Sequence, residues 1–152
     1  MQWRDKNATD EDIWNALDIA QAKDFVEKKP DKLDEMILQE GKNLSGGQRQ
    51  RLTIARALVG DPEILILDDS ASALDLATDA RLRKAIHKKT SGMTVFIVSQ
   101  RISSIKSADK IIVLDDGKIA GIGIHSELYN GCEVYKEICL SQLSEKEAQA
   151  NG

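Results

Sequence analysis

Three short apolar runs, each followed by a turn or a polar segment, constrain the fold of this chain most strongly. They lie at residues 64–67 (ILIL), 94–99 (TVFIVS) and 110–114 (KIIVL). A polar stretch with helical character, about 78–89, separates the first two runs. Strands that alternate with helices predict an α/β fold in which at least the first strands are parallel. After the third run, the sequence DDGKIAGIG predicts a hairpin, because Asp-Gly is a favoured two-residue turn.

The composition predicts a soluble globular chain with an aliphatic core. The 152 residues are one domain's worth of chain or slightly less, with 41% hydrophobic, 30% charged and only 4% aromatic residues. The net charge of -4, with both signs interspersed, argues against a nucleic-acid surface, which usually needs a basic stripe. No apolar run approaches the roughly 18 residues that a membrane span requires.

Two helices are predicted in the first 60 residues. The segment 7–30 has apolar residues at helical spacing, an N-cap at Thr9 and a stop at Pro30, so it predicts one amphipathic helix. A second helix should open after the small residues of LSGGQ and end at Gly60. The arginines of this second helix are interpreted as members of structural ion pairs; they are Arg49, Arg51 and Arg56.

The C-terminal part, from Ser126, is predicted to be helical and then to fray. Cys132 and Cys139 are expected to share that helix, on one face and about 10 Å apart by helix rise. This separation is too large for a disulfide, so both cysteines are interpreted as reduced packing residues.

The run 64–67 ends in two adjacent carboxylates, Asp68 and Asp69. A strand of a parallel sheet would deliver Asp68 to the carboxyl edge, where α/β folds bind ligands. A carboxylate there can hold Mg²⁺ directly or through water, and the metal would bridge nucleotide phosphates. Asp69 points differently and could polarise an attacking water. The alternative is a strand followed by a solvated acidic turn, which the carboxylate pair alone does not exclude.

The stretch LSGGQ, at Leu44–Gln48, favours the ligand-binding alternative. Ser45 offers a hydroxyl, and Gly46 and Gly47 let backbone N–H groups approach a ligand without a Cβ in the way. The helix that follows directs its positive dipole end to the same point, which favours phosphate oxygens. A plain helix cap with glycines would have the same sequence, but the spacing to ILILDD supports a phosphate site.

These motifs together resemble the ATP-binding cassette (ABC) ATPases, and the resemblance extends over nearly the whole chain. LSGGQ at 44–48 is similar to their signature motif, Ile64–Asp68 to their Walker B strand and Ser72–Asp75 to their D-loop. The region 94–127 resembles exporter-type cassettes in particular. The resemblance implies an ABC ATPase fold of the P-loop NTPase type, with ATP and Mg²⁺ as cofactors and Asp68 as the metal ligand. ABC-like ATPases of chromosome maintenance share some of these motifs, but GGQRQR, ARAL and DDGKI favour transporters.

Two catalytic positions depart from the family pattern. Asp69 stands where such proteins usually carry a glutamate that positions the hydrolytic water, and Gln100 stands in place of the switch histidine. A carboxylate one methylene shorter is withdrawn by about 1 Å, and such a misplacement can cost on the order of 100-fold in rate. Glutamine has no titratable nitrogen near neutral pH. Together the two changes resemble the slow, degenerate site of a heterodimeric exporter.

The resemblance also implies how the two sets of residues divide between sites. Cassettes of this family dimerise head to tail, so the intact signature motif would serve the nucleotide held by a partner cassette. Asp75 of the D-loop match is expected to take part in nucleotide binding. Asp68, Asp69 and Gln100 would line the chain's own site. A transmembrane exporter domain would be the other partner, which implies a location on the cytoplasmic side of the membrane, or in the cytosol if the chain occurs alone.

No G-x-x-x-x-G-K-[ST] phosphate loop occurs in the sequence. In family terms the chain resembles a C-terminal portion without Walker A. Its predicted parts are the helical signature subdomain (1–45), the C-terminal part of the ATPase core (46–140) and a flexible tail (141–152). Absent neighbouring strands would leave apolar edges unpaired, so we expect poor stability or aggregation of the isolated chain.

The hypothesis from the sequence is therefore the C-terminal portion of an ABC exporter's ATP-binding subunit. We expect ATP hydrolysis only in a dimer with a complete cassette, not from these 152 residues alone. One alternative is an inactive cassette remnant that acts by lending its signature motif to a partner. The other is a truncated product with no function.

Overall fold

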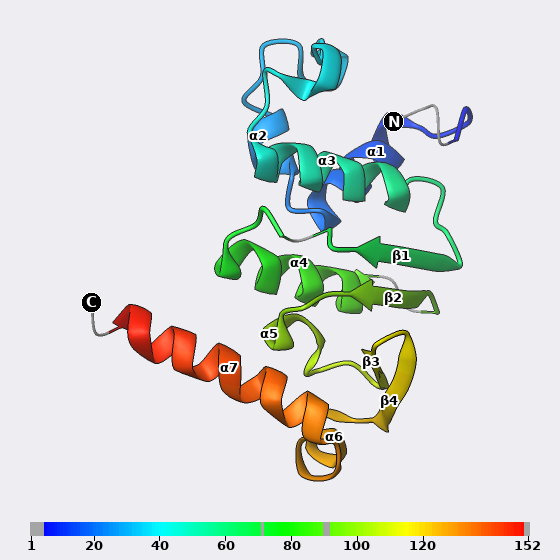
Figure 1. Cartoon of the computed structure of the whole chain (residues 1–152). Helices are drawn as coiled ribbons and strands as arrows, with labels where there is room; N and C mark the ends of the chain where they lie inside the picture. The colour runs from blue at the N-terminus through cyan, green and yellow to red at the C-terminus, as the bar shows by residue number, and fades with distance from the viewer. Residues whose placement is uncertain (1–4, 71, 90–91, 151–152) are drawn as a thin grey trace. The chain divides into compact units, whose positions relative to one another are not determined.

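The computed structural model describes residues 5–70, 72–89 and 92–150, with side chains described as far as Gln142. The chain divides into two compact units, Met1–Val98 and Ser99–Gly152, and each unit is described by itself (Figure 1). The elements of the N-terminal unit are α1 (Asp10–Ile19), α2 (Lys23–Val26), η1 (Lys32–Asp34), η2 (Gln39–Gly41), α3 (Gly46–Leu58), β1 (Ile64–Asp68), α4 (Leu76–Lys89) and β2 (Thr94–Val98). The elements of the C-terminal unit are α5 (Ile102–Ile105), β3 (Ile111–Asp115), β4 (Lys118–Gly123), α6 (His125–Gly131) and α7 (Glu133–Ala150).

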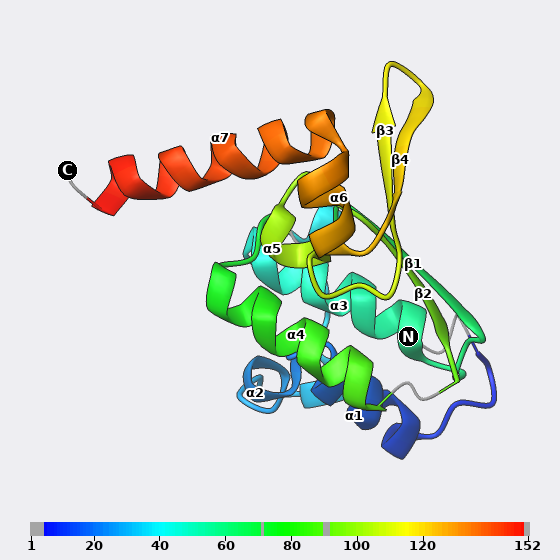
Figure 2. The ribbon, with the colours of Figure 1, turned by 90° about the horizontal axis from the view of Figure 1, so that it is seen from below.

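The N-terminal unit has a two-stranded parallel sheet, β1–β2, as the sequence predicts. Helices α1, α3 and α4 lie on one side of it (Figure 2). Because side chains alternate along a strand, Leu65 and Leu67 of β1 point toward these helices and are buried in the core. Leu17 of α1 and Ile54 of α3 belong to the same core.

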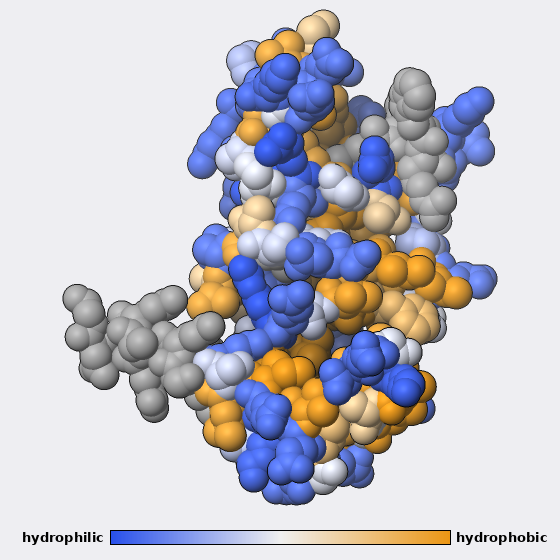
Figure 3. Space-filling view, in the orientation of Figure 1, coloured by the Kyte–Doolittle hydropathy of each residue, from blue (hydrophilic) through white to orange (hydrophobic). Residues whose placement is uncertain are grey.

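The other face of this sheet is apolar and exposed. Ile64 and Ile66 of β1, with Phe96 and Val98 of β2, each expose more than half of their surface. Figure 3 shows apolar side chains gathered over the two strands. A two-stranded sheet with one covered face leaves these residues in water, which is an arrangement that favours association.

The predicted helix over 7–30 is instead two helices, and the reason is a local cap. Thr9 starts α1 as predicted, in a capping box with Asp12. At its end Gln21 has a positive φ of 58°, and the N–H groups of Gln21 and Ala22 donate back to Asp18 and Leu17. This is a Schellman motif without glycine. Its left-handed residue is a glutamine, so the sequence carries no warning of the break.

The C-terminal unit is built on the predicted hairpin. β3 and β4 are antiparallel, and both turn residues, Asp116 and Gly117, have positive φ, as a type I′ turn requires. Helices α6 and α7 cover one face, where Ile111, Val113 and Tyr135 are buried.

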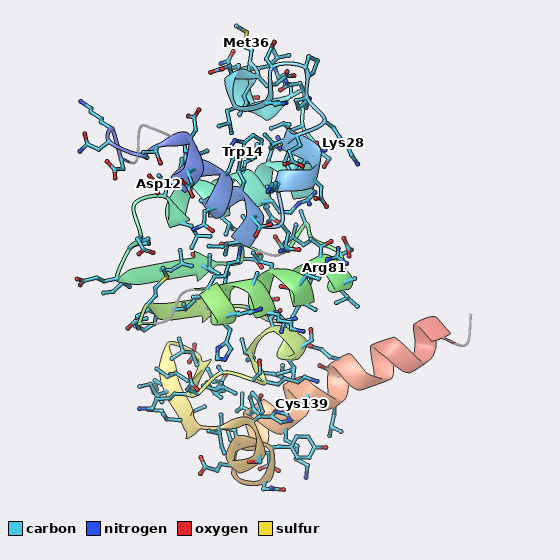
Figure 4. The ribbon with its side chains drawn as sticks, turned by 180° about the vertical axis from the view of Figure 1, so that it is seen from behind. Asp12, Trp14, Lys28, Met36, Arg81 and Cys139 are labelled. Carbon is cyan, nitrogen blue, oxygen red and sulfur yellow. The ribbon has the colours of Figure 1, made fainter. Side chains whose placement is uncertain are left out.

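The cysteine prediction is half right. Cys132 and Cys139 are both free and buried, as expected for packing residues. They do not share a helix, however, because Cys132 is the C-cap of α6 and Cys139 lies on α7 (Figure 4). The helix break has an extended backbone at Cys132 and directly follows Gly131, the last residue of α6, which the prediction of one continuous helix did not treat as a stop.

The backbone of α7 is helical to Ala150, and residues 151–152 lie outside the described part of the chain. The flexible tail from 141 therefore stays a prediction, as do the other sequence-based domain boundaries. No helix in the described ranges combines the length and apolarity needed to cross a membrane.

Candidate functional site

The LSGGQ segment forms the start of α3. Ser45 is the N-cap: its hydroxyl oxygen accepts the N–H of Gln48 at 3.2 Å, and the Gln48 amide oxygen accepts the N–H of Ser45 at 3.0 Å. The N–H groups of Gly46 and Gly47 belong to the first helical turn, which has no acceptor inside the helix. The positive end of a 13-residue helix is thus fixed by its own side chains, with two glycine N–H groups at its tip.

Two residues hold the loop before α3: Asn43 through hydrogen bonds and Leu44 through its place in the lining of a cavity. Asn43 accepts the N–H of Leu38 at 3.1 Å and donates to the carbonyl of Met36 at 2.9 Å. The Met36 side chain itself is 76% exposed (Figure 4). The side chain of Leu44 lines a cavity of about 300 Å³ together with apolar residues of α1, α2 and α3. Leu44 therefore anchors the segment in the unit.

The segment Ser72–Asp75 packs directly against the tip of α3. A Cβ added at Gly47 would lie 3.2 Å from the carbonyl oxygen of Ala73 and 3.5 Å from Leu74 Cδ2. Glycine favours this close approach, because a Cβ here would require the two segments to move apart by a few tenths of an ångström. Asp75 then caps α4, and its carboxylate accepts the N–H of Thr78 at 2.9 Å. Hydrogen bonds from the Thr78 side chain and N–H hold the pKa of Asp75 below its usual value.

Asp68 and Asp69 occupy the carboxyl end of β1, and both are exposed. Asp69 has a positive φ of 45°, so the backbone leaves the extended conformation of β1 at this residue. The Asp69 N–H donates to the carbonyl of Val98 at 3.0 Å. Its own carbonyl accepts the N–H and the hydroxyl of Ser72, at 3.2 and 3.0 Å.

Gln100 belongs to the C-terminal unit. It is exposed, and its carbonyl accepts a hydrogen bond from the Gln142 side chain. Gln142 also accepts the N–H of Ile102 at 2.9 Å, so α7 holds the backbone on both sides of Arg101. The structure therefore brings LSGGQ, Asp69 and Ser72–Asp75 together in one unit, and Gln100 lies in the other.

The Asp68 carboxylate fits a magnesium ion whose other ligands are waters and nucleotide phosphates. Described residues form no group of three or more His, Cys, Asp or Glu side chains able to hold a metal. Mg²⁺ does not need such a group, because it usually takes one or two carboxylates, several waters and substrate phosphates. The exposed Asp68 carboxylate can supply one such ligand.

The sequence predicts ion pairs for the arginines of α3, and this prediction is wrong. No ion pair among the described residues includes Arg49, Arg51 or Arg56. Arg49 donates to the carbonyl of Glu40 at 3.0 Å, and Arg51 donates to the carbonyl of Gln21 and stacks on Phe25. The sequence also gives no signal of the contact that Gln50 makes. Its side-chain amide forms two hydrogen bonds with the segment Ser72–Asp75.

Comparisons with known proteins agree with these motifs. A family model described as ABC transporter matches residues 3–72. An uncharacterised ABC transporter ATP-binding protein of Mycobacterium tuberculosis is 44% identical over 138 residues, which are 91% of this chain and 23% of that protein. The multidrug resistance ABC transporter ATP-binding and permease protein of Lactococcus lactis subsp. cremoris is 41% identical over 91% of this chain and 23% of that protein.

A solved structure gives the same result. A bacterial Atm1-family ABC exporter with ATP bound matches with a TM-score of 0.88 and 33% identity, over 93% of this chain and 25% of that one. The chain thus spans about a quarter of the length of the relatives it matches. The chain belongs to the ABC transporter family, and its fold is that of part of an ABC exporter's ATPase domain.

Proposed function

We propose that this chain serves ATP binding in an ABC exporter and contributes its signature motif to the nucleotide site of a second cassette. The observation that carries the proposal is the tip of α3, where the Ser45–Gln48 capping box fixes the helix end and leaves two glycine N–H groups. The Ser45 hydroxyl and these N–H groups would donate to phosphate oxygens, and the helix dipole would add to the attraction. The partner would be a complete cassette, and the membrane domain of the exporter would place the chain on the cytoplasmic side.

We infer a different role for Asp68, Asp69 and Gln100. Asp68 would hold Mg²⁺, which when bound to ATP neutralises phosphate charge. Asp69 would orient water, and Gln100 would donate to the terminal phosphate. The shorter carboxylate of Asp69 and the uncharged amide of Gln100 support slow hydrolysis at this site, as in the degenerate site of a heterodimer. The chain would then act chiefly by completing its partner's site.

A chimaeric transporter tests this proposal. The 138-residue segment that matches in the Lactococcus lactis multidrug resistance protein is replaced by the segment of this chain. We expect photolabelling by an azido-ATP probe, with ATP hydrolysis on the order of 100-fold below that of the unmodified Lactococcus protein. Asp69→Glu combined with Gln100→His should recover most of that rate. Asp31→Glu, the same change at an exposed loop position, is the matched control and should recover none.

Two outcomes would contradict it. Hydrolysis by the chimaera at the rate of the unmodified Lactococcus protein would show that Asp69 and Gln100 do not impair the site. A chimaera that folds and reaches the membrane but takes no azido-ATP label would refute the nucleotide-binding role itself.

A further inference from the structure

Gln50 lies in the second turn of α3 and uses both ends of its side-chain amide. Its Nε2 donates to the hydroxyl oxygen of Ser72 at 3.0 Å, and its Oε1 accepts the backbone N–H of Ala73 at 3.0 Å. The N–H of Ala73 can only donate, so the amide oxygen must face it and the amide nitrogen must face Ser72. One side chain thus joins the signature helix to a segment 22 residues further along the chain.

The Ser72 hydroxyl extends this connection to Asp69. It donates to the carbonyl oxygen of Asp69 at 3.0 Å. A hydroxyl has a single proton, so a hydroxyl that donates to Asp69 must accept from Gln50, and this direction agrees with the amide orientation that Ala73 imposes. The hydrogen bonds therefore form one consistent chain: Gln50 donates to Ser72, and Ser72 donates to the backbone carbonyl of Asp69.

We propose that Gln50 is a positioning residue that fixes the segment Ser72–Asp75 against the signature helix and, through Ser72, fixes the backbone of Asp69. The inference rests on the proposed function. Under that function, the N-terminal end of α3 would bind the nucleotide held by the partner cassette, and Asp69 would act on the nucleotide held by this chain. Because Gln50 connects them, a shift of the signature helix when a partner cassette binds would also move Ser72 and the backbone of Asp69. Gln50 would thus couple the two sites within one chain.

Hydrogen exchange of the Ala73 amide in the 152-residue chain tests the positioning role without nucleotide or partner. Gln50→Met keeps the length of the side chain but has no amide, so the Ala73 N–H loses its acceptor. We expect exchange about five-fold faster or more, the factor that corresponds to one hydrogen bond of ~1 kcal/mol. Gln50→Glu keeps an acceptor oxygen and should leave Ala73 protected. Arg56→Ala, an exposed change in the same helix, is the control.

Exchange at Ala73 that is equal in Gln50→Met and the parent chain would overturn the proposal. If Gln50→Met did not fold, Gln50→Ala would provide the same comparison. The consequence for coupling is measured in the chimaera that carries Asp69→Glu and Gln100→His. There Gln50→Met should lower kcat and leave the KM for ATP unchanged, because both amide atoms of Gln50 are used for Ser72 and Ala73 and it is not among the residues proposed to bind nucleotide. An unchanged kcat together with faster exchange would refute the coupling but not the nucleotide site, which azido-ATP labelling reports separately.

Discussion

Gly121 in β4 is a position where a single methyl group should destabilise the C-terminal unit. A Cβ built at Gly121 would lie 2.9 Å from Leu128 Cδ2, 3.1 Å from Cys132 Sγ and 3.3 Å from Cys132 Cβ. Leu128 and Cys132 are buried, so neither can move into solvent to make room. The strand and helix α6 must separate instead, and overpacking of this kind costs about 1–3 kcal/mol.

A small gain opposes this cost. Alanine has less backbone entropy to lose than glycine on folding, which favours Gly121→Ala by roughly 0.5–1 kcal/mol. The clash is larger than this gain, so we expect net destabilisation of about 1–2 kcal/mol. The amides of β3 and β4 should then exchange roughly 5–30-fold faster than in the parent chain.

Gly131→Ala is the matched control, because a Cβ at Gly131 in α6 meets no atom within 4 Å and alanine is a better helix former. That variant should be as stable as the parent or slightly more stable. Gly121→Ala combined with Cys132→Ala should cost less than the sum of the two changes, since the smaller residue removes one of the close contacts. Equal exchange rates in Gly121→Ala and the parent would show that α6 does not pack on β4 as closely as described.

Two further predictions concern the N-terminal unit. The pKa of Asp75 is lowered by its hydrogen bonds to Thr78, so its contribution to the stability of α4 is present above the ordinary aspartate value of 3.8 and is lost as the pH falls through the lowered pKa. Asp75→Asn, which still caps the helix, should make exchange of the α4 amides less pH-dependent in this acidic range. Ile66→Lys should reduce association of the isolated chain in static light scattering without unfolding it, because Ile66 is 66% exposed. Leu65→Lys, at a buried position of the same strand, should unfold the unit.

The types of the main elements could be predicted from the sequence because each carries a local signal. The alternation of apolar strands and polar helices gives the parallel pair β1–β2, and the Asp116-Gly117 turn gives the hairpin. The two helix breaks that the sequence-based prediction missed have different causes: the first is at a non-glycine residue with positive φ, and the second is at an ordinary extended residue after Gly131. Gln21 in a left-handed conformation divides the first helix, and Cys132 with an extended backbone separates α6 from α7.

The site was predictable as a set of residue types, but its internal geometry was not. LSGGQ and the Asp68-Asp69 pair are recognisable because phosphate and magnesium need glycine N–H groups and carboxylates. The role of Gln50 depends on a contact across 22 residues, and a glutamine on a helix carries no signal of such a contact. Asp75 caps α4 through a local contact. The sequence did not indicate this role, because the predicted helix begins at about 78 whereas α4 begins at Leu76.

The contacts inside the N-terminal unit order the LSGGQ segment without a ligand, so under the proposed function it would not need nucleotide to take up its geometry. Three sets of contacts among the described residues order the tip of α3 from within this unit: the Ser45–Gln48 box, the Ala73 carbonyl against Gly47 and the two hydrogen bonds of Gln50. No ligand is needed to satisfy these groups, so binding would not have to supply their ordering entropy. The apolar face of β1–β2 is the opposite case, since its side chains remain exposed in the unit. A chain built in this way should present its signature motif in a fixed geometry even when its own sheet is incompletely covered. Weak association of the isolated chain and a protected Ala73 amide are therefore expected in the same sample.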